Sequence, residues 1–154
     1  MGSVSTKRSV FVPGAPAPQG SKAFKGIRGG KAILIESSKA VGPWRERIAL
    51  AAHSHAAGLL PPPVSVGLEF VMPRPKSAPK RSTPAAIKRP DIDKLARAVL
   101  DALTGVWLED DSHVVCLRAT KRIALPGELP GVAIVCTVDS PRKRSAHNRK
   151  GWAL

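Results

Sequence analysis

Five aspartates gather in one short part of this sequence, and the carboxylates of four of them are candidates to hold a divalent metal ion. Asp91 and Asp93 lie in the motif Arg-Pro-Asp-Ile-Asp-Lys-Leu, Asp101 lies in Leu-Asp-Ala-Leu, and Asp111 lies in Leu-Glu-Asp-Asp-Ser. The whole chain has only 11 acidic residues against 25 lysines and arginines. Cationic side chains bind phosphates and carboxylates bind metal, which is what metal-dependent cleavage of a polyanion requires. The pattern therefore predicts a nuclease.

Asp91 and Asp93 are expected at the entrance of a helix, where both can stay ionised. The exposed backbone N–H groups and the positive end of the helix dipole offset the crowding of negative charge, and carboxylate oxygens are the ligands that magnesium requires. A structural explanation is also open, since an N-cap acid and a first-turn acid are common at such positions. That explanation does not account for the cationic segments on either side of the two acids.

For Asp101 and Asp111 the residues alone leave two roles open. A helical rise of 1.5 Å per residue puts Asp101 roughly 12 Å from Asp93, too far for one metal to join them directly. Asp101 can instead pair with Arg97 at i−4, and we weigh this structural role equally against a catalytic one. Residues 105–110 turn the chain, and they either return Asp111 to the helix entrance or leave it in an exposed turn.

The chain is strongly basic, with a net charge of +14 and a pI of about 10.8. A charge of this size, without a basic amphipathic helix, favours nucleic acid over a membrane as the partner, and a merely soluble surface is the alternative. Residues 73–90 contain five prolines and no acid, a composition that cannot build a core. We expect a mobile cationic loop whose DNA-binding side chains are Lys76, Lys80, Arg81, Lys88 and Arg89.

The length of 154 residues and the hydrophobic content of 43% predict one domain over residues 1–140, followed by a basic tail, 141–154. The tail is expected to be loosely ordered unless it meets DNA or a partner. No apolar run approaches the roughly 20 residues of a transmembrane helix, and the N-terminus lacks a signal peptide's apolar core. These features predict a cytoplasmic protein that associates with the nucleoid through DNA. Cys116 and Cys136 fit no metal-ligand spacing and are expected to be buried thiols.

Hydrophobic periodicity predicts a mixed α/β domain in which about two helices pack on a small β-sheet. Alternation with a period of two predicts strands at 10–12, 31–35, 64–72, 112–124 and 132–138. Helical spacing runs from Pro43 to about Gly58 and, most clearly, from Asp91 to Leu103. The glycine-containing stretch 26–30 is expected to form a basic hairpin turn, which either contacts phosphate or is solvated.

Three motifs follow one another closely along the chain. They are Arg-Pro-Asp-Ile-Asp-Lys-Leu, Val-Leu-Asp-Ala-Leu-Thr-Gly and Trp-Leu-Glu-Asp-Asp-Ser-His-Val-Val. Together, over Lys88 to about Lys121, they resemble the RusA family of Holliday junction resolvases, which phages and prophages often carry. The segment 16–22 also resembles the N-terminal loop of many members. The resemblance implies a RusA-like mixed α/β fold, a homodimer, and Mg²⁺ as cofactor, with Mn²⁺ able to substitute. It marks as catalytic, magnesium-binding carboxylates Asp91, Asp93 and Asp111, and it matches Asp101 to a recurrent aspartate.

The chain departs from the family's pattern at two positions beside these aspartates. Lys94 stands where the family usually has asparagine, and Arg97 stands where it has a catalytic-site lysine. A guanidinium does not deprotonate, so Arg97 is expected to act by electrostatic stabilisation. Lys94 is our candidate for the missing lysine function.

The resemblance implies an enzyme of DNA recombination and repair that resolves Holliday junctions by paired, symmetric nicks. A dimer suits this reaction because a four-way junction has approximate two-fold symmetry. Two alternatives stay open on the residues alone. One is a nuclease for other branched DNA, such as forks or flaps, and the other is a non-catalytic DNA-binding protein whose acids only order the central helix.

Overall fold

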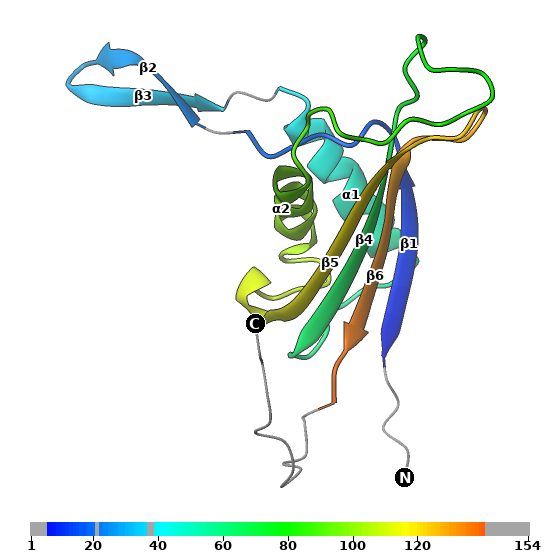
Figure 1. The fold of residues 1–154 in the computed structure, drawn as a ribbon. Coiled ribbons are helices and arrows are strands. Elements are labelled where there is room, and N and C mark those ends of the chain that lie inside the picture. Colours follow the sequence, from blue (N-terminus) through cyan, green and yellow to red (C-terminus); the bar gives the residue numbers. More distant parts are fainter. Residues whose placement is uncertain (1–5, 21, 37–38, 141–154) are drawn as a thin grey trace, which may run out of the picture.

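Two helices cover one face of a four-stranded sheet, and a two-stranded hairpin projects away from them (Figure 1). The computed structural model describes residues 6–20, 22–36 and 39–140, so the predicted tail 141–154 lies outside the described residues. In chain order the elements are β1 (Lys7–Pro13), β2 (Lys22–Arg28), β3 (Lys31–Glu36), α1 (Val41–His55), β4 (Val64–Met72), α2 (Ile92–Leu103), the 3₁₀ turn η1 (Asp111–His113), β5 (Val114–Ile123) and β6 (Gly131–Val138). The mixed α/β class is thereby confirmed.

The strands of the main sheet are ordered β1-β6-β4-β5. Strand β6 pairs antiparallel with both β1 and β4, whereas β4 and β5 are parallel. Strands β5 and β6 follow each other in sequence, yet β4 lies between them. Because β4 and β5 are parallel neighbours, the chain between them must cross from one end of the sheet to the other, and α2 makes that crossing.

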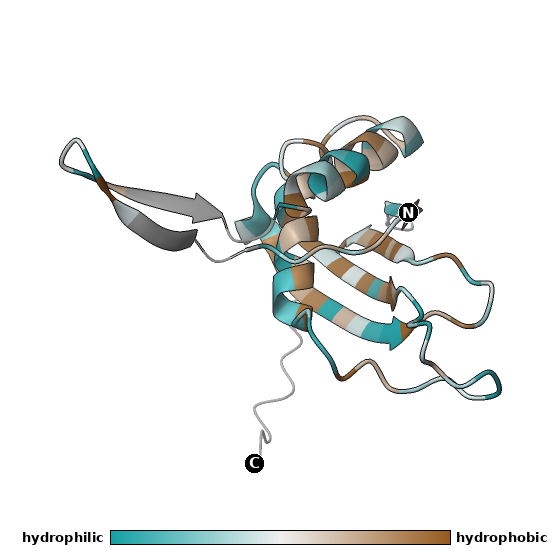
Figure 2. Cartoon of the chain, turned by 90° about the horizontal axis from the view of Figure 1, so that it is seen from above, coloured by the Kyte–Doolittle hydropathy of each residue, from teal (hydrophilic) through white to brown (hydrophobic). Residues whose placement is uncertain are grey.

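The core lies between the sheet and the two helices (Figure 2). Strand β4 supplies buried residues at alternate positions, and the apolar stripe of α2 faces them. Burying a large aliphatic or aromatic side chain contributes roughly 1.5–3 kcal/mol, and the fully buried set includes Ile48, Val66, Phe70, Leu95, Val99 and Leu103. The opposite side of α2 is left in solvent, where it exposes charged side chains.

Trp107 fixes the turn that follows α2. Its side chain is fully buried, and its indole Nε1 donates to the carbonyls of Ala52 and Ala56 at 3.1 and 2.9 Å. These carbonyls belong to the C-terminal end of α1, where that of Ala52 also accepts from the backbone amide of Ala56 at 3.0 Å. The backbone amide of Leu60 in turn donates to the Trp107 carbonyl at 2.8 Å. The segment leading to Asp111 is therefore tied to the end of α1.

The predicted hairpin turn is confirmed, but its first strand was missed. Strand β2 begins at Lys22, within a stretch expected to be loop, and pairs with β3 through Gly29 and Gly30. These two glycines have φ values of 58° and 75°, which suit a tight turn between antiparallel strands. The described part of the chain contains no helix long and apolar enough to cross a membrane.

The prediction that both cysteines are buried is wrong for Cys116. Cys136 is buried in β6, and burial raises the pKa of its thiol to about 12. Cys116 is exposed because it lies on β5, the edge strand, where apolar alternation does not ensure that a neighbour covers the side chain. Local periodicity cannot distinguish an edge strand from a central one.

Candidate active site

Asp91 lies at the start of α2 with its carboxylate open to solvent. It occupies the predicted N-cap position, but its side chain makes no capping hydrogen bond, and 54% of it is exposed. Its Oδ2 lies 3.9 Å from Nζ of Lys94, and Asp93 follows in the exposed first turn. Capping therefore does not occupy the Asp91 oxygens, which remain available to a ligand.

A lysine from the sheet holds the chain immediately before Asp91. Nζ of Lys121, on β5, donates to the carbonyls of Lys88 and Pro90 at 2.9 and 2.8 Å. Lys121 pairs in register with buried Phe70 and therefore belongs to the helix-covered face of the sheet. This half-buried ammonium therefore holds in place the backbone that leads into Asp91.

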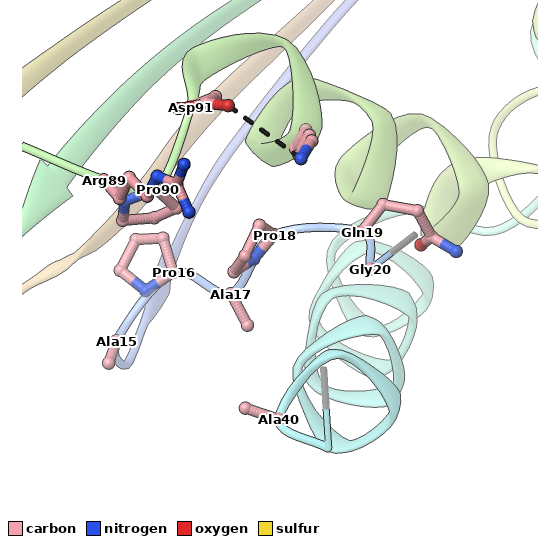
Figure 3. A pocket seen from close by; sticks show the side chains of 11 residues that line it. Ala15, Pro16, Ala17, Pro18, Gln19, Gly20, Ala40, Arg89, Pro90 and Asp91 are labelled. Carbon is pink, nitrogen blue, oxygen red and sulfur yellow. Dashed lines mark ion pairs between the residues drawn. The ribbon is translucent and has the colours of Figure 1, made fainter. Parts of the chain in front are cut away.

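A pocket of about 540 Å³ opens beside Asp91 (Figure 3). One wall is the loop 15–20, and the other is the segment Arg89–Asp91 together with Lys94. The backbone amide of Gln19 donates to the Lys94 carbonyl at 3.0 Å, so the loop is attached directly to α2. Gln19 Oε1 also accepts from Nη1 of Arg45 at 3.1 Å. The loop that resembled the family's N-terminal segment thus forms part of the site.

Arg97 joins two of the remaining aspartates. Its Nε lies 3.3 Å from Asp101, and its Nη1 lies 3.1 Å from Asp111. Asp101 is also 3.8 Å from Arg45 of α1, so the predicted pairing of Asp101 with Arg97 is confirmed and a second cation is added. Arg97 itself is 59% exposed. The arrangement holds Asp111 against the second turn of α2.

The turn 105–110 does return Asp111 to α2, but its contact is with Arg97 and not with the acids at the helix entrance. Its neighbour Asp110 accepts from the backbone amide of Ser112 at 2.8 Å, and hydrogen bonds from Ser112 hold the pKa of Asp110 below its usual value. Within the ranges that the structure describes, no three His, Cys, Asp or Glu side chains lie close enough together to hold a metal ion. The carboxylate chemistry of Asp91 and Asp93 fits magnesium, while Asp111 is engaged by Arg97.

The cationic loop between β4 and α2 has a defined path. Arg74 donates to Thr83, to the carbonyls of Ser82 and Ala124 and, through a further short bond, to that of Pro79. The side chains predicted to bind DNA all lie in solvent, and none pairs with an acid in the described part of the chain; they are Lys76, Lys80, Arg81, Lys88 and Arg89. Arg74 thus stabilises the conformation of the loop, and the other cations of the loop are exposed to solvent.

Comparison with known proteins identifies the family to which this site belongs. Residues 13–136 match the sequence model of the family described as Endodeoxyribonuclease RusA. The chain belongs to the RusA endodeoxyribonuclease family. It is accordingly a nuclease that acts on DNA, and its family resolves Holliday junctions in recombination and repair. The chain is also 32% identical, over 120 residues, to the uncharacterized protein YqaN of Bacillus subtilis (strain 168), and the match covers 71% of this chain and 83% of that protein.

Three residues that position the candidate site were missed in the sequence. Lys121 is a lysine at a strand position whose alternate neighbours are apolar, and this mismatch could have marked it. Trp107 lies inside the third motif, but nothing in the sequence indicates that its indole caps another helix. Arg45 lies on α1, and its reach to Asp101 depends on how the two helices pack. Only the first of these could have been found from local pattern.

Proposed function

We propose that this RusA family member resolves four-way DNA junctions by two symmetric, magnesium-dependent nicks, acting as a homodimer in the cytoplasm. The observation that carries the proposal is the open carboxylate of Asp91 in a pocket that it shares with Arg89 and Lys94. The pocket lies where a loop rich in exposed cations meets the helix. A DNA phosphate bound by that loop would therefore lie close to the carboxylate of Asp91.

Asp91, Asp93 and Asp111 are the proposed ligands of Mg²⁺, for which Mn²⁺ can substitute. When bound, the metal lowers the pKa of a water and stabilises negative charge on the phosphoryl oxygens. In this assignment Lys94 screens the charge of Asp91 from its position 3.9 Å away and is placed to move a proton, unlike Arg97. Arg97 holds Asp111 at 3.1 Å, so Asp111 joins the other two acids only when Arg97 turns toward a phosphate instead.

DNA binding is assigned to the exposed cations of the loop, with the domain 1–140 carrying the chemistry. Contacts to phosphates position a nucleic acid without reading its sequence. Branched shape is therefore the main determinant of recognition in this proposal. Two copies related by a two-fold axis would place their sites on opposing strands of the junction.

The test is incubation of the purified protein with a labelled four-way junction, a fork, a flap and a linear duplex, with magnesium, with manganese and with chelator. We expect symmetric nicks confined to the four-way junction and dependent on metal. Nicking of forks or flaps at an equal rate would assign the enzyme to branched DNA in general. Cleavage in chelator would overturn the role of the metal.

Asp111→Asn tests the assignment of the ligands. Cleavage should be abolished while junction binding is retained or strengthened, because one negative charge near phosphate is removed. Glu109→Gln is the matched control, since it removes one exposed charge two residues away and should leave cleavage intact. Equal cleavage by the Asp111→Asn variant and the control would remove Asp111 from the site.

A further inference from the structure

A second pocket, of about 650 Å³, lies beside the pocket that contains Asp91. The two pockets share Ala15, Pro16, Arg89 and Pro90 in their walls, so these residues form the ridge between them. The second pocket extends from this ridge under the loop 73–90 to the ends of β4 and β5. Its occupant would therefore lie next to Asp91.

The walls of this pocket are held apart by hydrogen bonds within the loop. The Arg74 guanidinium, which does not itself line the pocket, bonds to both arms of the loop at Pro79, Ser82 and Thr83 and to the chain after β5 at Ala124. Lys121 holds the third side by binding the carbonyls of Lys88 and Pro90. These bonds give the loop around the pocket a defined path.

The residues that line this pocket are mostly apolar, and those that are charged are cationic. The lining consists mainly of prolines, alanines, Met72, Ile87 and Ile123, and it includes no acidic residue. The charged groups in the lining are Lys88 and Arg89, which lie three and two residues before Asp91 in sequence. An apolar pocket of 300–1,000 Å³ with a few polar groups is typical of a site for a small molecule or part of one. The lining suits an apolar surface that is attached to a negatively charged group.

We propose that this pocket receives one unstacked nucleobase of the bound DNA, while the phosphate of the same nucleotide lies toward Asp91. The inference rests on the proposed cleavage of branched DNA. A base at a branch point has lost part of its stacking, so extruding it costs less than in a continuous duplex. Apolar contact with the base face then offsets the lost stacking without selecting among bases by hydrogen bonds.

The first experiment places 2-aminopurine, which fluoresces more strongly when unstacked, at successive positions around the crossing point of the junction. The full chain is added with calcium in place of magnesium, so that binding is measured without cleavage. We expect a several-fold rise in fluorescence at one position per strand. A rise at no position, in a protein that cleaves the junction, would overturn the inference and leave the proposed function standing.

Two substitutions test whether the base enters this particular pocket. Ala86→Trp fills it from the loop side, and Ile87→Asp adds a charge at a side chain that is 89% exposed, so the fold should not depend on it. Both should abolish the fluorescence rise, read at wavelengths that tryptophan does not absorb. Ala57→Trp, at an exposed position after α1, is the matched control. A rise that survives both pocket variants would place the base elsewhere.

An abasic nucleotide at the responding position completes the test. Ala86→Trp should slow cleavage of the intact junction roughly tenfold, because contact with the base is lost. It should slow cleavage of the abasic junction less than twofold, since no base then needs the pocket. Equal slowing of both substrates would show that the variant damages the site in another way and would overturn the inference. Loss of cleavage by the unsubstituted chain on every substrate would instead refute the proposed function.

Discussion

Replacing Lys121 with methionine should loosen the entrance of α2 and slow cleavage more than it weakens DNA binding. The ammonium ties β5 to the carbonyls of Lys88 and Pro90, and methionine keeps most of the apolar stem but donates no hydrogen bond. Hydrogen bonds that involve a charged group contribute about 1.5–3 kcal/mol each. Because Lys121 is only half-buried, screening by solvent reduces the sum of the two to about 1–2 kcal/mol.

A loss of 1–2 kcal/mol of local stability corresponds to roughly a 5- to 30-fold change in an equilibrium constant. We expect the single-turnover cleavage rate to fall within that range, because Asp91 is correctly placed in a smaller fraction of molecules. Hydrogen exchange of the Leu95 amide, which donates to the Asp91 carbonyl at 3.1 Å, should accelerate in parallel. This amide reports on the first turn of α2.

Arg118→Met is the matched control for Lys121→Met. It removes one positive charge from the same strand, but at an exposed position on the opposite face. The control should leave the Leu95 exchange rate unchanged and alter cleavage less than the Lys121 variant does. If Lys121→Met leaves both the exchange rate and the cleavage rate at the level of the control, the proposed positioning role is refuted.

Three further predictions concern stability and DNA binding. Trp107→Phe removes the donor to two carbonyls at the end of α1, so it should cost about 1–2 kcal/mol and lower Tm by roughly 3–6 °C in a thermal melt. Glu128, whose pKa hydrogen bonds from Arg122 lower to about 2 from 4.5, contributes stability that is complete above pH 4.5 and is lost as the pH falls toward 2. The dependence of Tm on pH over that range should therefore be weaker in Glu128→Gln. The double variant Lys80→Gln, Arg81→Gln should reduce the slope of log affinity for the junction against log salt by about 1.8, if each residue contacts one phosphate.

Each of these results has a clear opposite. An unchanged Tm in Trp107→Phe would mean that the indole N–H does not stabilise the turn. If Tm falls equally below pH 4.5 in Glu128→Gln and in the unsubstituted chain, the pair between Glu128 and Arg122 does not contribute to stability. An unaltered slope of log affinity against log salt would mean that the loop does not make these phosphate contacts.

Local patterns predicted the elements that carry the site, because burial on one face leaves a periodic record in the sequence. The strand 64–72 has the bounds that alternation predicted, and the helix Asp91–Leu103 differs from α2 only in counting its N-cap. Arg97 and Asp101 were also placed correctly as an i, i+4 pair, since helical geometry fixes their distance. These statements all depend on neighbours within one element.

Contacts between elements were beyond the reach of the sequence. Alternation shows that two faces of a strand differ, but it does not show which strands are neighbours, so β4 between β5 and β6 was not foreseen. The exposure of Cys116 follows from the same edge position. The approach of Asp111 to Arg97 depends on Trp107 meeting α1, a contact between residues far apart in the chain. Each of these features depends on packing that no single segment determines.

The parallel pairing of β4 with β5 has an architectural consequence. The proposed catalytic acids and the cationic loop all belong to the single connection that leaves β4 at Met72 and enters β5 at Val114. The rest of the sheet, β1 and β6, contributes none of them and serves as a frame. Evolution can therefore lengthen, shorten or recharge this one connection to suit differently branched DNA without disturbing the register of the strands. It is equally the segment to exchange between relatives in order to transfer substrate preference as a unit.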